Sequence, residues 1–293
     1  MVPSSEERSL ELLAPAGDWA ALEAALEAGA DAVYFGLTSL NARRGAKNFE
    51  PEEFRRAVEL LHQRGAKAYL TLNIDLAQRE LGQAARMLEL ARQAGADAVL
   101  VRDPALLALR PEYAEIEFHF STQTCMANSA DVAAAGHCGA DRVVLARELS
   151  LSEIAAASAV ENVETEVFVQ GALCFSVSGR CLLASWVGGR SGNRGACTSP
   201  CRVPWSVAGE PAGTPLAMHD LAAVDRLDEL RRAGVSALKI EGRLKTAQWV
   251  GDAAGLYRRA IDGENPQELR QEAEKLGGYT GRQLTSGYLD RER

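Results

Sequence analysis

Four cysteines within one short stretch are the residues of this 293-residue chain that most directly suggest chemistry. They follow the pattern Cys-x6-Cys-x15-Cys-x3-Cys, at Cys174, Cys181, Cys197 and Cys201. Four thiolates can hold a zinc ion or an iron–sulfur cluster. Zinc sites usually contain cysteine pairs about two to four residues apart, and only the second pair fits, so the spacing favours a cluster over zinc. Buried free thiols are the structural alternative.

The two remaining cysteines are predicted not to be ligands. Cys125 follows a predicted strand, and Cys138 precedes a glycine at a predicted helix end. Free cysteine is commonly buried as a small apolar residue, so we expect both to be structural.

Arginines accompany the clustered cysteines at positions 180, 190, 194 and 202. The whole chain is acidic, with 32 Lys and Arg against 40 Asp and Glu, a formal charge of −8. Planar guanidinium groups bind carboxylates or phosphates with two parallel hydrogen bonds. The segment therefore predicts either a local anion site on an acidic protein or a solvated loop. The acidic balance argues against a general nucleic-acid binder.

A repeated Gly-Ala-x-Ala motif indicates how the chain positions these residues. The motif begins at Gly29, Gly65 and Gly95, with looser copies at Gly139 and Gly234. The preceding stretches place apolar residues at helical spacing, as Phe54, Val58 and Leu61 do before the second copy. The pattern predicts a helix that ends at the glycine, followed by a short buried strand.

Eight strands alternating with helices predict an α/β fold, a closed TIM-like (β/α)8 barrel. The predicted strands are Leu10–Ala14, Ala32–Gly36, Ala68–Asn73, Ala98–Arg102, Phe118–Gln123, Arg142–Ala146, Glu166–Gln170 and Ala237–Glu241. The barrel is assigned to residues 1–262 and carries a cysteine-rich insertion, residues 171–215, after strand seven. Residues 263–293 are assigned to a C-terminal tail or linker. An open, doubly wound sheet is the alternative fold.

Barrel chemistry occurs at the carboxyl ends of the strands, so polar residues there are site candidates. Arg43, Arg147 and Arg243 follow strands two, six and eight, and are predicted to bind a small dianionic carboxylate. Asn73, at the end of strand three, is a further candidate contact.

Two more arginines, Arg180 and Arg194, could close over the same mouth from the insertion. Glu241 and Gln123 are the candidate catalytic residues, with Glu241 orienting an arginine or carrying a proton. A merely structural pairing of Glu241 with Arg243 or with neighbouring loops is the alternative.

Several function classes lack their usual signals. The chain has no His-Glu-x-x-His, Gly-x-Ser-x-Gly, Walker or dinucleotide-binding motif, which argues against the standard peptidases and nucleotide enzymes. It has no apolar run of about 18 residues, so no membrane helix is expected. The polar segment Met1–Arg8 does not read as a signal peptide, so we expect a cytoplasmic protein.

Several blocks, in order along nearly the whole chain, resemble the peptidase U32, or collagenase-like, family. They are Leu12–Gly17, Ala32–Gly36, Asn41–Arg43, Ser121–Gln123 with Asn128, Glu166–Cys174, Ser178–Cys181, Gly195, Cys197, Cys201-Arg202, His219–Leu221 and Lys239–Arg243.

The resemblance implies a barrel-like fold and a 4Fe–4S cluster held by the four clustered cysteines. It also implies oxygen-independent hydroxylation, with prephenate as the oxygen source. The implied acceptor is a uridine of tRNA or a cytidine of rRNA. Alternatives are hydroxylation of ubiquinone precursors, where the chain would form one half of a heterodimer, a U32-type peptidase, and a zinc-stabilised binding module. A homodimer is the other assembly considered.

Overall fold

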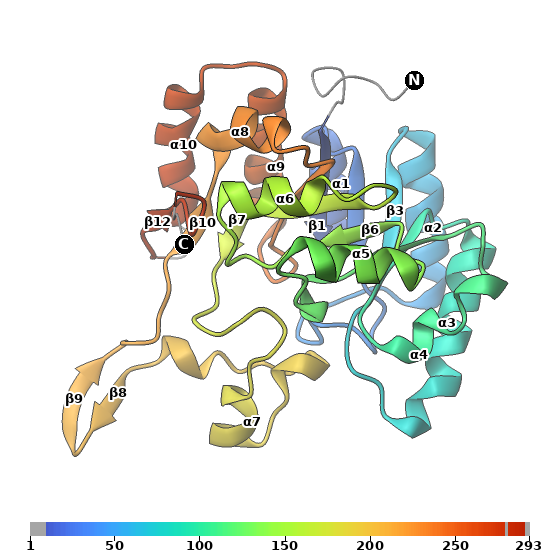
Figure 1. The fold of residues 1–293 in the computed structure, drawn as a ribbon, viewed down its shortest axis with the longest axis horizontal. Helices are drawn as coiled ribbons and strands as arrows, with labels where there is room; N and C mark the ends of the chain where they lie inside the picture. The colour runs from blue at the N-terminus through green and yellow to red at the C-terminus, as the bar shows by residue number, and fades with distance from the viewer. Residues whose placement is uncertain (1–9, 279–280, 291–293) are drawn as a thin grey trace.

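The computed structural model describes residues 10–278 and 281–290, in which eight parallel strands form a closed barrel (Figure 1). The strands are β1 (Glu11–Ala16), β2 (Ala32–Phe35), β3 (Lys67–Leu72), β4 (Ala98–Val101), β5 (Glu117–Phe120), β6 (Arg142–Val144), β7 (Glu164–Ala172) and β11 (Ala237–Ile240). The predicted barrel is confirmed. The largest difference in bounds is at the end of β5, where Gln123 lies in a 3-10 turn, η3 (Thr122–Thr124).

Closure of the barrel rests on β11, which pairs in parallel with both β7 and β1. Leu238 stands opposite Leu12 on one side and Val167 on the other. Both edges are thereby paired, so the alternative of an open, doubly wound sheet is wrong.

Helices between the strands form the outer layer, as Figure 1 shows. They are α1 (Trp19–Glu27), α2 (Pro51–Gln63), α3 (Leu81–Ala94), α4 (Pro104–Leu107), α5 (Ser129–His137), α6 (Leu151–Ser158), α8 (Leu227–Arg232) and α9 (Ala247–Ile261). The predicted apolar face of α2 is buried, and α6 begins with a capping box between Ser150 and Glu153. Among the described residues, no helix is long and apolar enough to cross a bilayer.

The repeated glycines have the predicted role. Gly29, Gly65, Gly95, Gly139 and Gly234 all have positive φ, between 74° and 89°. Glycine adopts this left-handed conformation without the steric cost that a Cβ imposes. Each repeat therefore ends its helix sharply and directs the chain into the next strand.

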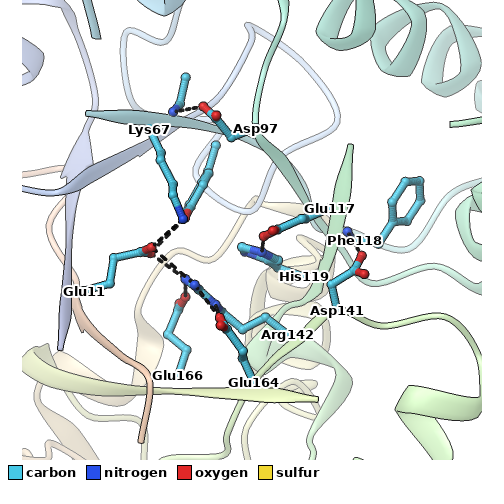
Figure 2. Close-up of polar contacts among 12 residues, drawn as sticks. Glu11, Lys67, Asp97, Glu117, Phe118, His119, Asp141, Arg142, Glu164 and Glu166 are labelled. Carbon is cyan, nitrogen blue, oxygen red and sulfur yellow. Dashed lines mark hydrogen bonds and ion pairs between the residues drawn. The ribbon is translucent and has the colours of Figure 1, made fainter. Parts of the chain in front are cut away.

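The amino end of the barrel is closed by charged side chains (Figure 2). Arg142, at the start of β6, is 3% exposed and lies 2.5 Å from Glu11, 2.6 Å from Glu164 and 3.4 Å from Glu166. Lys67 contacts Glu11 from the exposed side at 3.1 Å. Burial alone would raise the pKa of Glu11, but Arg142 and Lys67 outweigh it and hold that pKa at about 2.

Between β7 and β11 the chain leaves the barrel and then returns to its edge. The segment contains α7 (Leu183–Gly188), the turns η4 (Gly192–Arg194) and η5 (Pro200–Arg202), and a hairpin of β8 (Trp205–Val207) and β9 (Glu210–Gly213). The chain returns as β10 (Asp220–Ala222), antiparallel to the end of β7. In Figure 1 α7 and the hairpin, in yellow, project from the barrel.

This segment is held against the barrel loops near Gly195. The carbonyl of Gly195 accepts from the amide of Arg44 at 3.3 Å, and the carbonyl of Asn193 accepts from Asp75 at 3.4 Å. A Cβ on Gly195 would lie 2.1 Å from the carbonyl oxygen of Asn41. Only glycine fits this approach, so the insertion is fixed to the loops after β2 and β3.

After α9 the described residues form α10 (Pro266–Gly278) and the short strand β12 (Leu284–Thr285). Leu269, Ala273 and Leu276 of α10 are buried. Strand β12 pairs with β10, although the sequence analysis assigned residues 263–293 to a tail or linker. Helix α10 packs on α9. The domain boundary at residue 262 stays a prediction.

Candidate functional site at the carboxyl end of the barrel

A pocket opens at the carboxyl ends of the strands, and six of the predicted site residues line it. These six are Arg43, Asn73, Gln123, Arg147, Glu241 and Arg243. The other residues that line the pocket are Tyr34, Ala42, Leu100, Ser121, Thr122, Val144, Phe168 and Lys239. The roles of the six stay predictions, and the geometry below shows what each can do.

The carboxylate of Glu241 bridges two arginines. One oxygen contacts Arg43, and the other lies 2.8 Å from Arg147. Burial alone would raise the pKa of Glu241, but the charges of Arg147 and Arg43 prevail and hold it at about 2. A carboxyl with so low a pKa stays ionised at neutral pH. Of its two predicted roles, this environment suits orienting arginines rather than carrying a proton.

Arg243 is buried, at 4% exposure, and its contacts are neutral. Its guanidinium donates to Asn41 at 2.9 Å and to Thr71 at 3.1 Å. Gly36 leaves the space for it, since a Cβ there would lie 2.5 Å from the guanidinium. Burial lowers the pKa of Arg243 to about 9, so it stays a cation at neutral pH. The alternative pairing of Glu241 with Arg243 is absent from the described contacts, whereas its pairing with neighbouring loops is present, through Arg43 and Arg147.

Asn73 and Gln123 are fixed by neighbouring loops. Asn73 donates to Ser121 at 3.2 Å and accepts from the amide of Ala42 at 3.1 Å. Gln123 accepts from Arg102 at 2.9 Å through its side-chain oxygen. Both amides can therefore position a ligand, but neither can transfer a proton at neutral pH.

The floor of the pocket contains residues that the sequence analysis missed. Phe168 lies under the guanidinium of Arg147, with 4.1 Å between the centre of its ring and the guanidinium carbon. Leu100 and Val144 add apolar surface. Lys239 is 3% exposed, and its ammonium group lies 2.6 Å from Glu166. The sequence did contain a signal for Lys239, which is a charged residue inside an otherwise apolar strand. Alternate residues of a strand share one face, so Lys239 lies on the same face as Glu241.

The two predicted arginines from the insertion lie elsewhere. Arg194 donates to the carbonyl of Asp75 and pairs with Glu80 at 2.6 Å, which fastens the insertion to the barrel. Arg180 lies beside the Cys125 thiol, whose pKa is raised by burial and lowered in part by this arginine. Neither lines the pocket, so their closure over the mouth stays a prediction.

Of the four clustered cysteines, Cys174 lies near the pocket, and the other three interact with it or with one another. Desolvation raises the pKa of the Cys174 thiol, and the charges of Arg147 and Arg43 oppose this shift. The thiol of Cys197 interacts electrostatically with Cys174 and Cys201, and Cys201 also with Cys181. Among the described residues, no three Cys, His, Asp or Glu side chains gather closely enough for a single metal ion.

The sequence model of peptidase family U32 matches residues 17–293. The chain belongs to this family. A solved structure of the U32 peptidase Mk0906 superimposes with a TM-score of 0.56 and 14% identity, covering 83% of this chain and 96% of that one. At this identity the likeness shows the shared fold alone.

Two curated relatives carry names from RNA modification. The tRNA hydroxylation protein P1 of Bacillus subtilis is 34% identical over 265 residues, covering 86% of this chain and 63% of the relative. The 23S rRNA 5-hydroxycytidine C2501 synthase of Escherichia coli is 36% identical over 259 residues, covering 86% and 39%. The chain thus spans less than two thirds of the length of these relatives.

Proposed function

We propose that this U32 protein is an iron–sulfur-dependent, oxygen-independent RNA hydroxylation enzyme, with a tRNA uridine as the favoured acceptor. The observation that carries the proposal is the convergence of three arginines at a barrel mouth beside Cys174, the first of the four clustered cysteines. The names of the two relatives support RNA as the acceptor class.

The pocket suits a small molecule that combines carboxylates with an apolar ring, which supports prephenate as the oxygen source. Arg43, Arg147 and Arg243 supply three cationic forks, and Glu241 neutralises only one charge among them. Below them, Phe168 and Leu100 offer apolar surface. A dianionic ligand would balance the remaining charge and place its ring on this floor.

The cysteines suit a 4Fe–4S cluster better than a single zinc ion. In such a cluster each iron takes one thiolate, so the thiolates stand farther apart than around one ion. Cys174, Cys181, Cys197 and Cys201 would hold the group, which when bound supplies one-electron transfer beside the pocket. The chain's own residues bind the carboxylates, orient them through Glu241 and exclude water with the apolar floor.

The insertion suits RNA. Among the described residues, all exposed large apolar side chains except Leu244 belong to it: Phe175, Val177, Leu182, Trp186, Val187, Val203 and Val207. Residues 171–215 contain four arginines and one glutamate, a charge of 4 − 1 = +3 in a chain of −8. Unpaired bases stack on aromatic side chains, and arginines bind the backbone phosphates.

The decisive experiment gives the anaerobically iron-loaded protein both prephenate and tRNA, and measures nucleosides by mass spectrometry. We expect one oxygen atom to be added to a uridine, only when prephenate is present. Release of peptides from denatured collagen by cluster-free protein, with no oxygen gained by tRNA or rRNA, would favour a peptidase instead.

The cluster is tested by iron and sulfide analysis of anaerobically purified protein. Cys181→Ala should lose the iron, because one iron would lack its protein ligand. Cys125→Ser is the matched control and should keep it. Stoichiometric zinc without iron in the wild type would contradict the cluster.

The RNA surface is tested by titrating labelled tRNA with Trp186→Ala. Trp186 is 80% exposed, so its removal should leave the fold intact. Loss of one stacked base should weaken binding by about 1–3 kcal/mol. Val207→Ala, an exposed aliphatic residue on the hairpin, is the control, and equal affinities for both variants would exclude stacking on Trp186.

A further inference from the structure

Lys239 is a buried amine at the floor of the pocket. It lies on β11, one inward-facing position below Glu241, and is 3% exposed. Its nitrogen lies 4.4 Å from the centre of the Tyr34 ring and 5.7 Å from that of Phe168. One hydrogen bond, to Glu166 at 2.6 Å, is described for it. The ammonium thus has a carboxylate on one side and aromatic rings beside it.

The surroundings of Lys239 favour its neutral form more than those of a surface lysine. Burial lowers its pKa despite the pairing with Glu166. The charges of Arg142 and Arg243 lower it further. A desolvated lysine near other cations is the kind of amine that attacks carbonyl groups.

We infer that Lys239 forms an imine with the ketone of a 2-oxo acid bound under the arginines. The inference rests on the proposed function, because it uses the same carboxylate pocket. It adds that the ligand is bound covalently, through its ketone.

The atoms balance without an oxidant or a reductant. The Lys239 ammonium gives one proton to Glu166, and the free amine attacks the ketone carbon. A carbon–nitrogen bond forms, and the carbonyl oxygen leaves as water with one proton from the amine and one returned by Glu166. The product is a protonated imine, so a cation remains beside Glu166 and its ion pair is preserved.

The same arrangement explains how a 2-oxo acid would be oriented. Its carboxylate would bind the arginines at the mouth, and its carbonyl would point down toward Lys239. Tyr34 donates to the carbonyl of Ile240 at 2.8 Å, which holds its ring beside the amine. Aromatic walls limit the access of water that would hydrolyse the imine.

Borohydride trapping on the full chain tests this directly. The protein is incubated with pyruvate or phenylpyruvate, reduced with sodium borohydride and mapped by mass spectrometry. We expect one reduced adduct, on the peptide that contains Lys239. Lactate, a carboxylate of similar size without a ketone, should give none.

Two variants complete the test. Lys239→Arg keeps the charge and should abolish the adduct, with folding checked by circular dichroism. Lys67→Gln removes another carboxylate-paired lysine, outside the pocket, and should leave the adduct unchanged. If Lys239→Arg does not fold, the mapped site in the wild type still decides.

Calorimetry with pyruvate and phenylpyruvate separates the proposal of an imine on Lys239 from the proposal of a carboxylate pocket. Binding of pyruvate without any trapped adduct, or with an adduct on another lysine, would overturn the imine and leave the carboxylate pocket standing. Absence of both binding and adduct would overturn the pocket assignment together with the imine.

Discussion

The two ends of the barrel use the same residue types in opposite proportions. At the amino end one arginine, Arg142, is surrounded by three carboxylates (Figure 2). At the mouth one carboxylate, Glu241, lies between two arginines, and a third, Arg243, contacts only neutral partners. At the amino end Arg142 is therefore surrounded by anions, whereas the mouth has a surplus of positive charge.

This difference separates a structural network from a binding site. Buried charges are costly unless they are paired, so the network around Arg142 mainly supports the fold. Unbalanced cations at the mouth are tolerated because solvent or a ligand anion can approach them. Charge balance, rather than the number of charged residues, thus distinguishes the end at which ligands bind.

The largest effect is expected when the amino-end network loses its central cation. Arg142→Met should leave Glu11 and Glu166 without their shared partner and cost about 3–5 kcal/mol of unfolding free energy. Urea unfolding measures this loss. Binding of lactate, which has no ketone and cannot form the imine, should be unchanged per folded molecule. A loss of stability below about 1 kcal/mol would show that the network is not structural.

Acid should weaken both ends, because each contains a glutamate with a pKa of about 2, below the ordinary 4.5. A depressed folded-state pKa stabilises the protein above about pH 4.5, and this contribution disappears as the pH falls toward 2. The ion pairs of Glu11 and those of Glu241 should each contribute on the order of 3 kcal/mol to the free energy of unfolding.

Unfolding measured between pH 2 and 6 tests this expectation. Glu11→Gln and Glu241→Gln should each flatten the acid-dependent loss of stability. An unchanged slope in Glu241→Gln would show that the mouth arginines do not depress its pKa.

Much of this architecture follows from local sequence patterns. The glycine repeat and the short apolar runs identified all eight barrel strands because buried strands and helix ends have local signals. Arg43, Arg147 and Glu241 could be assigned to the mouth because each lies on the segment that follows a strand, with Glu241 directly after β11. The hairpin of β8 and β9 was missed, since its exposed residues have no buried face to give a pattern.

The ion-pair partner of a site residue was harder to predict than the end of the barrel at which the residue lies. Glu241 is two residues from Arg243 but pairs with Arg43, 198 residues away. The loop after β2 comes beside β11 only when the barrel closes through β1. Lys239 was overlooked for a related reason, because its partner Glu166 lies on another strand, 73 residues away.

At the mouth, Arg43→Ala should weaken ligand binding more than it weakens the fold. Removing one bidentate charged contact should cost about 1.5–3 kcal/mol, or roughly tenfold to a hundredfold in affinity. Calorimetry with prephenate on cluster-loaded protein measures this change. Wild-type affinity in both Arg43→Ala and Arg243→Ala would place the carboxylate site elsewhere.

The smallest effect is expected at the exposed edge of the amino-end network. The Lys67 side chain is 49% exposed, whereas that of Arg142 is 3% exposed, although both contact Glu11. Water and salt screen an exposed ion pair, so Lys67→Gln should cost no more than about 1 kcal/mol. Urea unfolding at low and high salt should show this small difference shrinking as salt increases. A loss as large as that of Arg142→Met would mean that the balance of charge across the whole network, and not the burial of each pair, sets its contribution to stability.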